Sequence, residues 1–95
     1  MRAAVLETQG QPLVVRDDVE IAPPRAGQVR VRVTHCGLCH SDLSILDGTF
    51  PAPTPILLGH EAAGVVDAVG ADVTGLALGD PVVLTAVPPC GSCYW

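Results

Sequence analysis

Alternation of apolar and polar residues is clearest in residues 29–35, which read VRVRVTH. Three valines would face one side of a strand, and two arginines and a threonine the other, because side chains alternate across a strand. This segment is predicted to be a half-buried strand. Weaker β patterns over residues 2–7, 13–21, 60–70 and 81–87 predict further strands, and about six short strands are expected in total. Gly64 predicts a bulge or a close backbone approach within the strand 60–70.

The connections between these strands are set by glycine and proline. Gly37 is expected to end the strand 29–35, and a short helix is predicted over residues 39–47, stopped at Gly48. Residues 49–59 contain three prolines and are expected to form a loop. The predicted fold class is mainly β, a small barrel or rolled sheet, in one domain over residues 1–95. Because aromatic residues make up only 3% of the chain, its core must use Val, Leu, Ile and Ala.

Charge excludes two classes of partner. The chain has 95 residues, a formal net charge of −5 and no lysine, and all five arginines lie at or before Arg32. A basic surface for nucleic acid or an anionic membrane is therefore not expected. Glu7 interrupts any apolar stretch of a signal peptide, and no apolar run reaches the length of a membrane span of about 20 residues. We therefore expect a cytoplasmic protein, in which cysteines serve as metal ligands or reactive thiols rather than disulfides.

Two cysteine pairs are candidates for chemistry. Cys36-x-x-Cys39 could be a redox pair, and together with Cys90-x-x-Cys93 it could form one four-cysteine zinc site, although the intervening segment 40–89 is longer than such modules usually have. Cys39 with His60 is the better combination, because catalytic zinc takes sulfur and nitrogen ligands from separate parts of a chain. Acids lie close to both residues in the sequence, and carboxylates behind metal ligands orient them.

A longer motif then gives a family resemblance. The stretch CGLCHSD at 36–42, followed by GHEAAGVVDAVGADV at 59–73, resembles the N-terminal part of the catalytic domain of zinc-dependent medium-chain alcohol dehydrogenases. The second stretch fits the zinc signature G-H-E-x-x-G-x(5)-G-x-x-V of that family. The likeness continues through Gly79-Asp80 to PCGSC at 89–93. It implies an incomplete GroES-like β-barrel, with the nucleotide-binding Rossmann domain and its G-x-G-x-x-G turn absent from this chain.

The resemblance also implies roles for single residues. Cys39 and His60 would be two ligands of the catalytic zinc, with Glu61 in its near shell and the third protein ligand, usually a cysteine, beyond Trp95. Ser41 would take the proton of the alcohol, and Asp42 would support the site from behind the metal.

Three more residues take implied roles in binding. His40 would approach the pyrophosphate of NAD(P), and Cys90 and Cys93 would be the first two ligands of a structural zinc. Cys36 matches no ligand. Ser44 stands where many members of the family carry a histidine, so the end of the proton relay differs here.

The function that the resemblance implies is oxidation of an alcohol to an aldehyde or ketone, with hydride transfer to NAD(P). The sequence around the two cysteine pairs favours primary or aromatic alcohols, and the small-molecule partner would be an alcohol or aldehyde. A homo-oligomer, dimer or tetramer, is expected of the complete protein, and the 95-residue chain alone is expected to be inactive. The alternative is a non-catalytic, truncated GroES-like module that binds zinc or serves a structural role.

Overall fold

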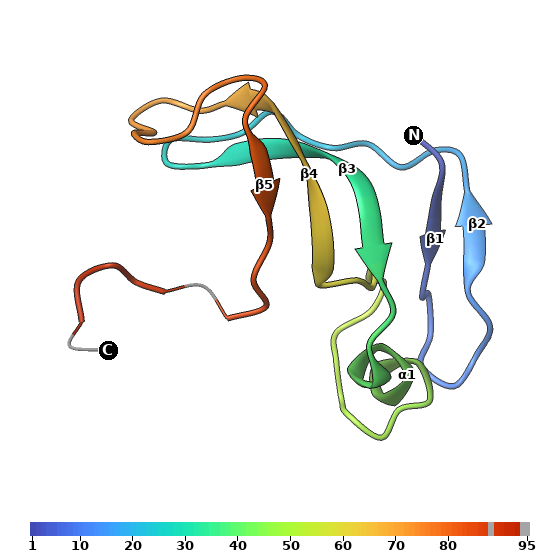
Figure 1. Ribbon diagram of the computed structural model, residues 1–95. Coiled ribbons are helices and arrows are strands. Elements are labelled where there is room, and N and C mark those ends of the chain that lie inside the picture. Colours follow the sequence, from blue (N-terminus) through green and yellow to red (C-terminus); the bar gives the residue numbers. More distant parts are fainter. Residues whose placement is uncertain (88, 94–95) are drawn as a thin grey trace.

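The computed structural model describes residues 1–87 and 89–93. Its elements follow in the order β1 (Ala3–Val5), β2 (Val14–Arg16), β3 (Val29–Gly37), α1 (His40–Leu46), β4 (Glu61–Val69) and β5 (Pro81–Val83). β1 and β2 form an antiparallel pair, and a second antiparallel sheet has the strand order β3-β4-β5. Figure 1 shows α1 beside the connection between β1 and β2, below the second sheet. The predicted mainly β class is confirmed, with five strands in the part of the chain that the structure describes.

The long β3-β4 pair contains the irregularity that Gly64 predicts. Its register shifts between Arg30 and Val31 and again between Val33 and His35, beside the residue that pairs with Gly64. A Cβ at position 64 would lie 2.9 Å from the backbone carbon of Arg32. Only glycine allows the two backbones to approach so closely, so the prediction of a close approach is confirmed.

β3 ends at Gly37, as predicted, although the strand runs two residues beyond the predicted range 29–35. Gly37 pairs with Glu61 at the start of β4, and a Cβ at Gly37 would lie 3.3 Å from Cβ of Glu61. The prediction that the valine face is buried is wrong at Val33, which is 51% exposed. The two register shifts interrupt the regular alternation along β3, which is why period-2 reasoning fails there.

β2 is shorter than the predicted strand 13–21. Arg16, its last residue, donates hydrogen bonds from its guanidinium to Asp18 at 2.6 Å and to Glu7 at 2.8 Å. Asp17 and Asp18 have low strand propensity, which agrees with the end of the strand at Arg16.

The predicted helix is confirmed, and α1 is one residue shorter at each end than the predicted range 39–47. Cys39 is the N-cap residue of α1, and Asp47 is its C-cap residue. The Asp42 carboxylate accepts a hydrogen bond of 3.2 Å from the backbone N–H of Cys39, which satisfies one of the donors that a helix start leaves free. Gly48, with φ of 87°, ends the helix as glycine commonly does.

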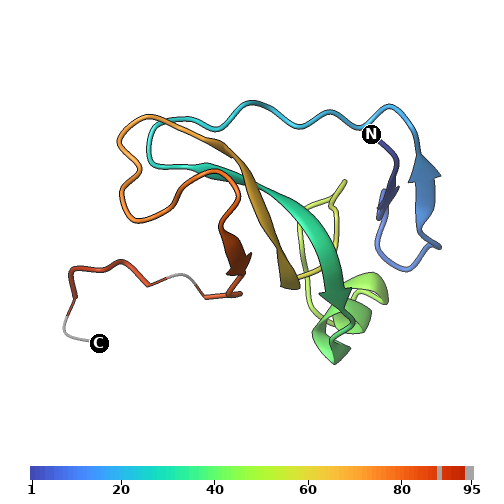
Figure 2. The same ribbon diagram turned by 45° about the horizontal axis from the view of Figure 1, so that its top comes forward.

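The core is small and aliphatic, as the composition predicts. Val5, Leu6 and Val66 are its buried hydrophobic members, and Leu6 joins Ile56 in an isolated bridge with backbone hydrogen bonds of 2.9 and 3.0 Å. The radius of gyration of 15.1 Å exceeds the value of about 13 Å expected for a domain of 100 residues. The two sheets therefore form an open arrangement rather than a closed barrel, as Figure 2 shows.

No helix among the described residues combines the length and the apolar character needed to cross a bilayer.

Candidate metal centre

Three potential metal ligands meet between α1 and β4. Donor atoms of Cys39, His60 and Glu61 all lie within 4.8 Å of one another. No other group of three or more such residues is found within 1–87 and 89–93. Cys39 and His60 are half-buried and Glu61 is exposed. The cluster therefore offers a thiol, an imidazole and a carboxylate at one partly accessible point.

The β3-β4 register brings these residues together. Gly37 at the end of β3 pairs with Glu61 at the start of β4. Cys39 follows two residues after Gly37, and His60 directly precedes Glu61, so the two predicted ligands lie at the same end of the strand pair. Gly59 has φ of 122°, a conformation that favours glycine and turns the chain into His60. The Gly59-His60-Glu61 motif therefore supplies a backbone conformation that positions the ligands, as well as the ligands themselves.

His60 is held by α1 through its Nδ1. Asp42 Oδ1 lies 3.3 Å from this nitrogen, and the Asp42 side chain is only 9% exposed. Oδ1 is buried and has no hydrogen bond of acceptable geometry, so the contact with His60 is an electrostatic one. A buried, unsatisfied carboxylate oxygen facing an imidazole favours a proton on Nδ1. That tautomer leaves Nε2 free as the ligand atom.

Ser41 lies on the other side of the same imidazole. Its Oγ is 3.2 Å from Nε2 of His60. Because Nδ1 faces Asp42, the hydroxyl lies beside the nitrogen that would bind a metal. Ser41 and Asp42 thus contact the two nitrogens of one histidine from adjacent positions in the first turn of α1.

The Cys39 thiol and the His60 imidazole influence each other's protonation. The pKa of Cys39 is lowered, chiefly by hydrogen bonding from the Ser41 side chain and backbone and then from His60. The pKa of His60 is raised, chiefly by hydrogen bonding with Cys39, with the charge of Asp42 adding to the effect. The lowered pKa brings the Cys39 thiol closer to the thiolate form that binds metals.

The donor set fits zinc. A thiolate and an imidazole are ligands that zinc prefers, and Glu61 adds an oxygen donor of a type found in catalytic zinc sites. Within the part of the chain that the structure describes, arginines form ion pairs with Glu7, Asp18 and Asp67 but not with Asp42 or Glu61. A cation bound at Cys39 would offset the negative charge of the Asp42 and Glu61 carboxylates. The buried oxygen of Asp42 would then face an imidazole fixed in the ligand tautomer.

His40 and Ser44 follow along α1. His40 is exposed at the start of the helix, and its backbone carbonyl accepts a hydrogen bond of 3.3 Å from the Ser44 hydroxyl. The Ser44 hydroxyl is therefore engaged within α1. The role of His40 toward a cofactor remains a prediction, because the described contacts involve only its backbone carbonyl.

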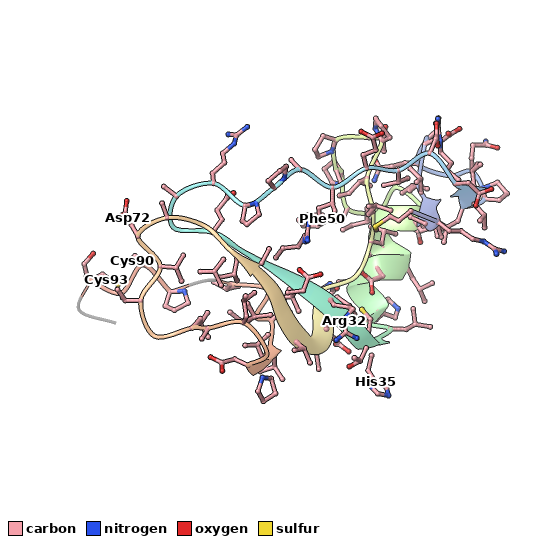
Figure 3. All side chains as sticks on the ribbon, turned by 90° about the horizontal axis from the view of Figure 1, so that it is seen from above. Arg32, His35, Phe50, Asp72, Cys90 and Cys93 are labelled. Carbon is pink, nitrogen blue, oxygen red and sulfur yellow. The ribbon has the colours of Figure 1, made fainter. Side chains whose placement is uncertain are left out.

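Cys90 and Cys93 lie on the segment after β5, which runs away from α1 in Figures 1 and 2. Figure 3 labels both residues on this segment. The backbone N–H of Cys93 donates to Cys90 Sγ at 3.2 Å, and the pKa of Cys90 is lowered to about 7, chiefly by Cys93 and then by Ser92. Neither cysteine joins the Cys39 cluster, and neither does Cys36. The structural-zinc role of Cys90 and Cys93 stays a prediction.

One contact to α1 had no signal in the sequence. The Gln9 side chain donates hydrogen bonds of 2.8 Å to the carbonyl oxygens of Ile45 and Phe50, at the far end of the helix. A glutamine in a predicted turn has no pattern that assigns it a partner so distant in the sequence. Only the packing of the β1-β2 connection against α1 shows it.

Known proteins share the fold of this chain. Residues 25–95 match the model of the alcohol dehydrogenase GroES-like domain. An alcohol dehydrogenase zinc-binding domain protein from Burkholderia ambifaria is similar at 48% identity and a TM-score of 0.85, over 98% of this chain and 25% of that one. Benzyl alcohol dehydrogenase from Acinetobacter calcoaceticus is similar at 39% identity and a TM-score of 0.87, over 98% of this chain and 25% of that one.

A thermostable alcohol dehydrogenase from Pyrobaculum aerophilum is similar at 38% identity and a TM-score of 0.87, over 99% of this chain and 28% of that one. The chain thus spans about a quarter of the length of the solved structures that it matches.

Proposed function

The chain belongs to the alcohol dehydrogenase GroES-like domain family, and from this premise we propose that it forms the zinc-holding part of an oxidoreductase. The enzyme would oxidise an alcohol to an aldehyde or ketone and pass hydride to NAD(P). The observation that carries the proposal is the cluster of Cys39, His60 and Glu61, whose donor atoms lie within 4.8 Å of one another.

In this proposal Cys39 Sγ and His60 Nε2 bind the metal, and Glu61 lies in or next to its ligand shell. The chemistry that zinc supplies when bound is Lewis-acid polarisation of an alcohol oxygen. Asp42 keeps the proton of His60 on Nδ1 and so holds the imidazole in its ligand form. Ser41, whose hydroxyl lies 3.2 Å from Nε2 of His60, is placed to accept the proton of the alcohol.

NAD(P) supplies the hydride acceptor. His40, exposed at the start of α1, would contribute a contact to the cofactor pyrophosphate, and a nucleotide-binding domain would supply the remaining contacts. Ser44 donates to the carbonyl of His40, so a relay from Ser41 would continue through water or the cofactor ribose. Cys90 and Cys93 would hold a separate structural zinc. A cytoplasmic homo-oligomer acting on a small alcohol completes the proposal.

Benzyl alcohol is the substrate to test first, because the similar enzyme from Acinetobacter calcoaceticus is a benzyl alcohol dehydrogenase. We expect His60→Ala to abolish NAD(P) reduction and to lower the zinc content of the protein that carries this sequence. His35→Ala is the matched control, since His35 is exposed on β3 and its ring contacts the Thr34 hydroxyl at 3.1 Å. Figure 3 shows His35 at the edge of the molecule.

Full turnover and zinc content in the His60→Ala variant would refute the proposed site. A parent protein that binds zinc at Cys39 and His60 but reduces no NAD(P) with any alcohol would instead support a non-catalytic zinc-binding module.

A further inference from the structure

The orientation of α1 must come from contacts outside the helix. α1 has seven residues, fewer than the roughly 12–15 that an isolated helix needs to be stable in water. Its N-terminal end carries Cys39, Ser41 and Asp42 and is fixed by the bond from the Cys39 N–H to Asp42. At about 1.5 Å per residue, its C-terminal end lies only about 10 Å away. A tilt at that end would therefore move the predicted metal ligand.

Gln9 and Gly10 hold this C-terminal end. The Gln9 Nε2 donates to the carbonyl oxygens of Ile45 and Phe50, each at 2.8 Å, and the Gly10 N–H donates to the Leu46 carbonyl at 2.7 Å. Carbonyls in the last turn of a helix have no partner within the helix. The β1-β2 connection thus caps α1 from outside and ties it to the following loop, beside which it lies in Figure 1.

The same N-terminal segment also binds the part of the chain that leads into His60. Leu6, fully buried, exchanges two backbone hydrogen bonds with Ile56, four residues before His60. Both halves of the metal centre are therefore anchored on residues 6–10: α1 through Gln9 and Gly10, and the chain before β4 through Leu6.

We propose that Gln9 is a positioning residue for the metal centre, acting as a double hydrogen-bond donor that fixes α1 and the Phe50 segment relative to β4. This inference rests on the proposed metal site. The donor function is specific, because both hydrogen bonds of the Gln9 side chain use Nε2. A carboxylate at position 9 would have the same shape but would place negative oxygens against two carbonyl oxygens.

The test uses Co²⁺ as a probe in the full protein. Binding at Cys39 is measured from the part of the cobalt–thiolate absorption band that Cys39→Ser removes, because thiolates at Cys90 and Cys93 would give a band of their own. We expect Gln9→Glu to weaken Co²⁺ affinity about five-fold or more, the change that loss of one to two hydrogen bonds would produce. Gln9→Lys, which keeps a donor, should restore affinity to about that of the parent. Gln11→Glu is the control, because Gln11 lies in the same turn, is exposed, and would undergo the same change of charge.

A folded Gln9→Glu protein with the parent's affinity and band would overturn the inference, as would a Gln9→Lys protein as weak as Gln9→Glu. If Gln9→Glu does not fold, Gln9→Met removes the donor without adding charge and carries the same expectation. A parent protein without any Cys39-dependent band would refute the proposed metal site itself, which separates that failure from failure of the Gln9 role alone.

Discussion

Asp42 Oδ1 lies 3.3 Å from Nδ1 of His60, and this contact joins the first turn of α1 to the residue before β4. The other oxygen of the same carboxylate accepts a hydrogen bond from the backbone N–H of Cys39 at 3.2 Å. One buried acid therefore positions both predicted zinc ligands. The arrangement gives Asp42 a role that depends on its charge as well as on its hydrogen bonding.

Replacing this acid should weaken the metal centre. We expect Asp42→Asn to lower zinc affinity by about 10- to 100-fold, the range typical of lost outer-shell partners. Competition with a chromophoric chelator measures the change. Asp47→Asn removes an exposed acid at the other end of α1 and should leave zinc affinity unchanged. Equal affinity in Asp42→Asn and the parent protein would show that the buried carboxylate does not support the ligand.

Close packing at Gly64 predicts a stability effect. A Cβ at this position would lie 2.9 Å from the Arg32 backbone carbon and 2.9 Å from Cγ1 of Val31. We expect Gly64→Ala to lower the free energy of unfolding by about 3 kcal/mol, because backbone atoms cannot move aside cheaply. Gly75→Ala meets no atom within 4 Å but has φ of 85°, so it should cost only about 1 kcal/mol. Denaturant unfolding compares the two, and a smaller loss for Gly64→Ala would contradict the close approach.

Acid sensitivity at the end of α1 should depend on Asp47. Its pKa is lowered from 3.8, chiefly by hydrogen bonding from Thr49, whose backbone N–H lies 2.8 Å from Oδ1. A lowered carboxyl pKa contributes stability above the unfolded value, and this stability is lost as the pH falls through the folded value. Unfolding measured between about pH 6 and about pH 2 should therefore show a smaller acid-induced loss for Asp47→Asn than for the parent. Identical pH profiles would exclude this contribution.

Features that depend on local sequence could be predicted well. The helix over 39–47, the close approach at Gly64 and the loop after Gly48 follow from single residues and short patterns, and all three are confirmed. The predicted family and its incomplete GroES-like fold are likewise confirmed by the match over residues 25–95 and by the solved structures. The long zinc signature made this possible, because it fixes many positions at once.

Features that depend on pairing between strands could not be predicted. β3 continues past residue 35 to Gly37 because Ala62 and Glu61 pair with it there, and the register shifts that expose Val33 follow from the partner strand rather than from the valine pattern. The Gln9 contacts have the same origin, since they join a turn to a helix end far away in the sequence. The meeting of Cys39 with His60 was expected from the motif, whereas the approach of Asp42 to Nδ1 of His60 needed the fold.

The two cysteines of the first pair provide the most direct test of the central claim, which is that Cys39 works with His60 and without Cys36. Zinc equivalents per chain, measured in the protein that carries this sequence, should fall by about one in Cys39→Ser and remain unchanged in Cys36→Ser. That result would place the metal where Cys39 and His60 meet. Retention of all zinc by Cys39→Ser, or an equal loss in Cys36→Ser, would contradict the account.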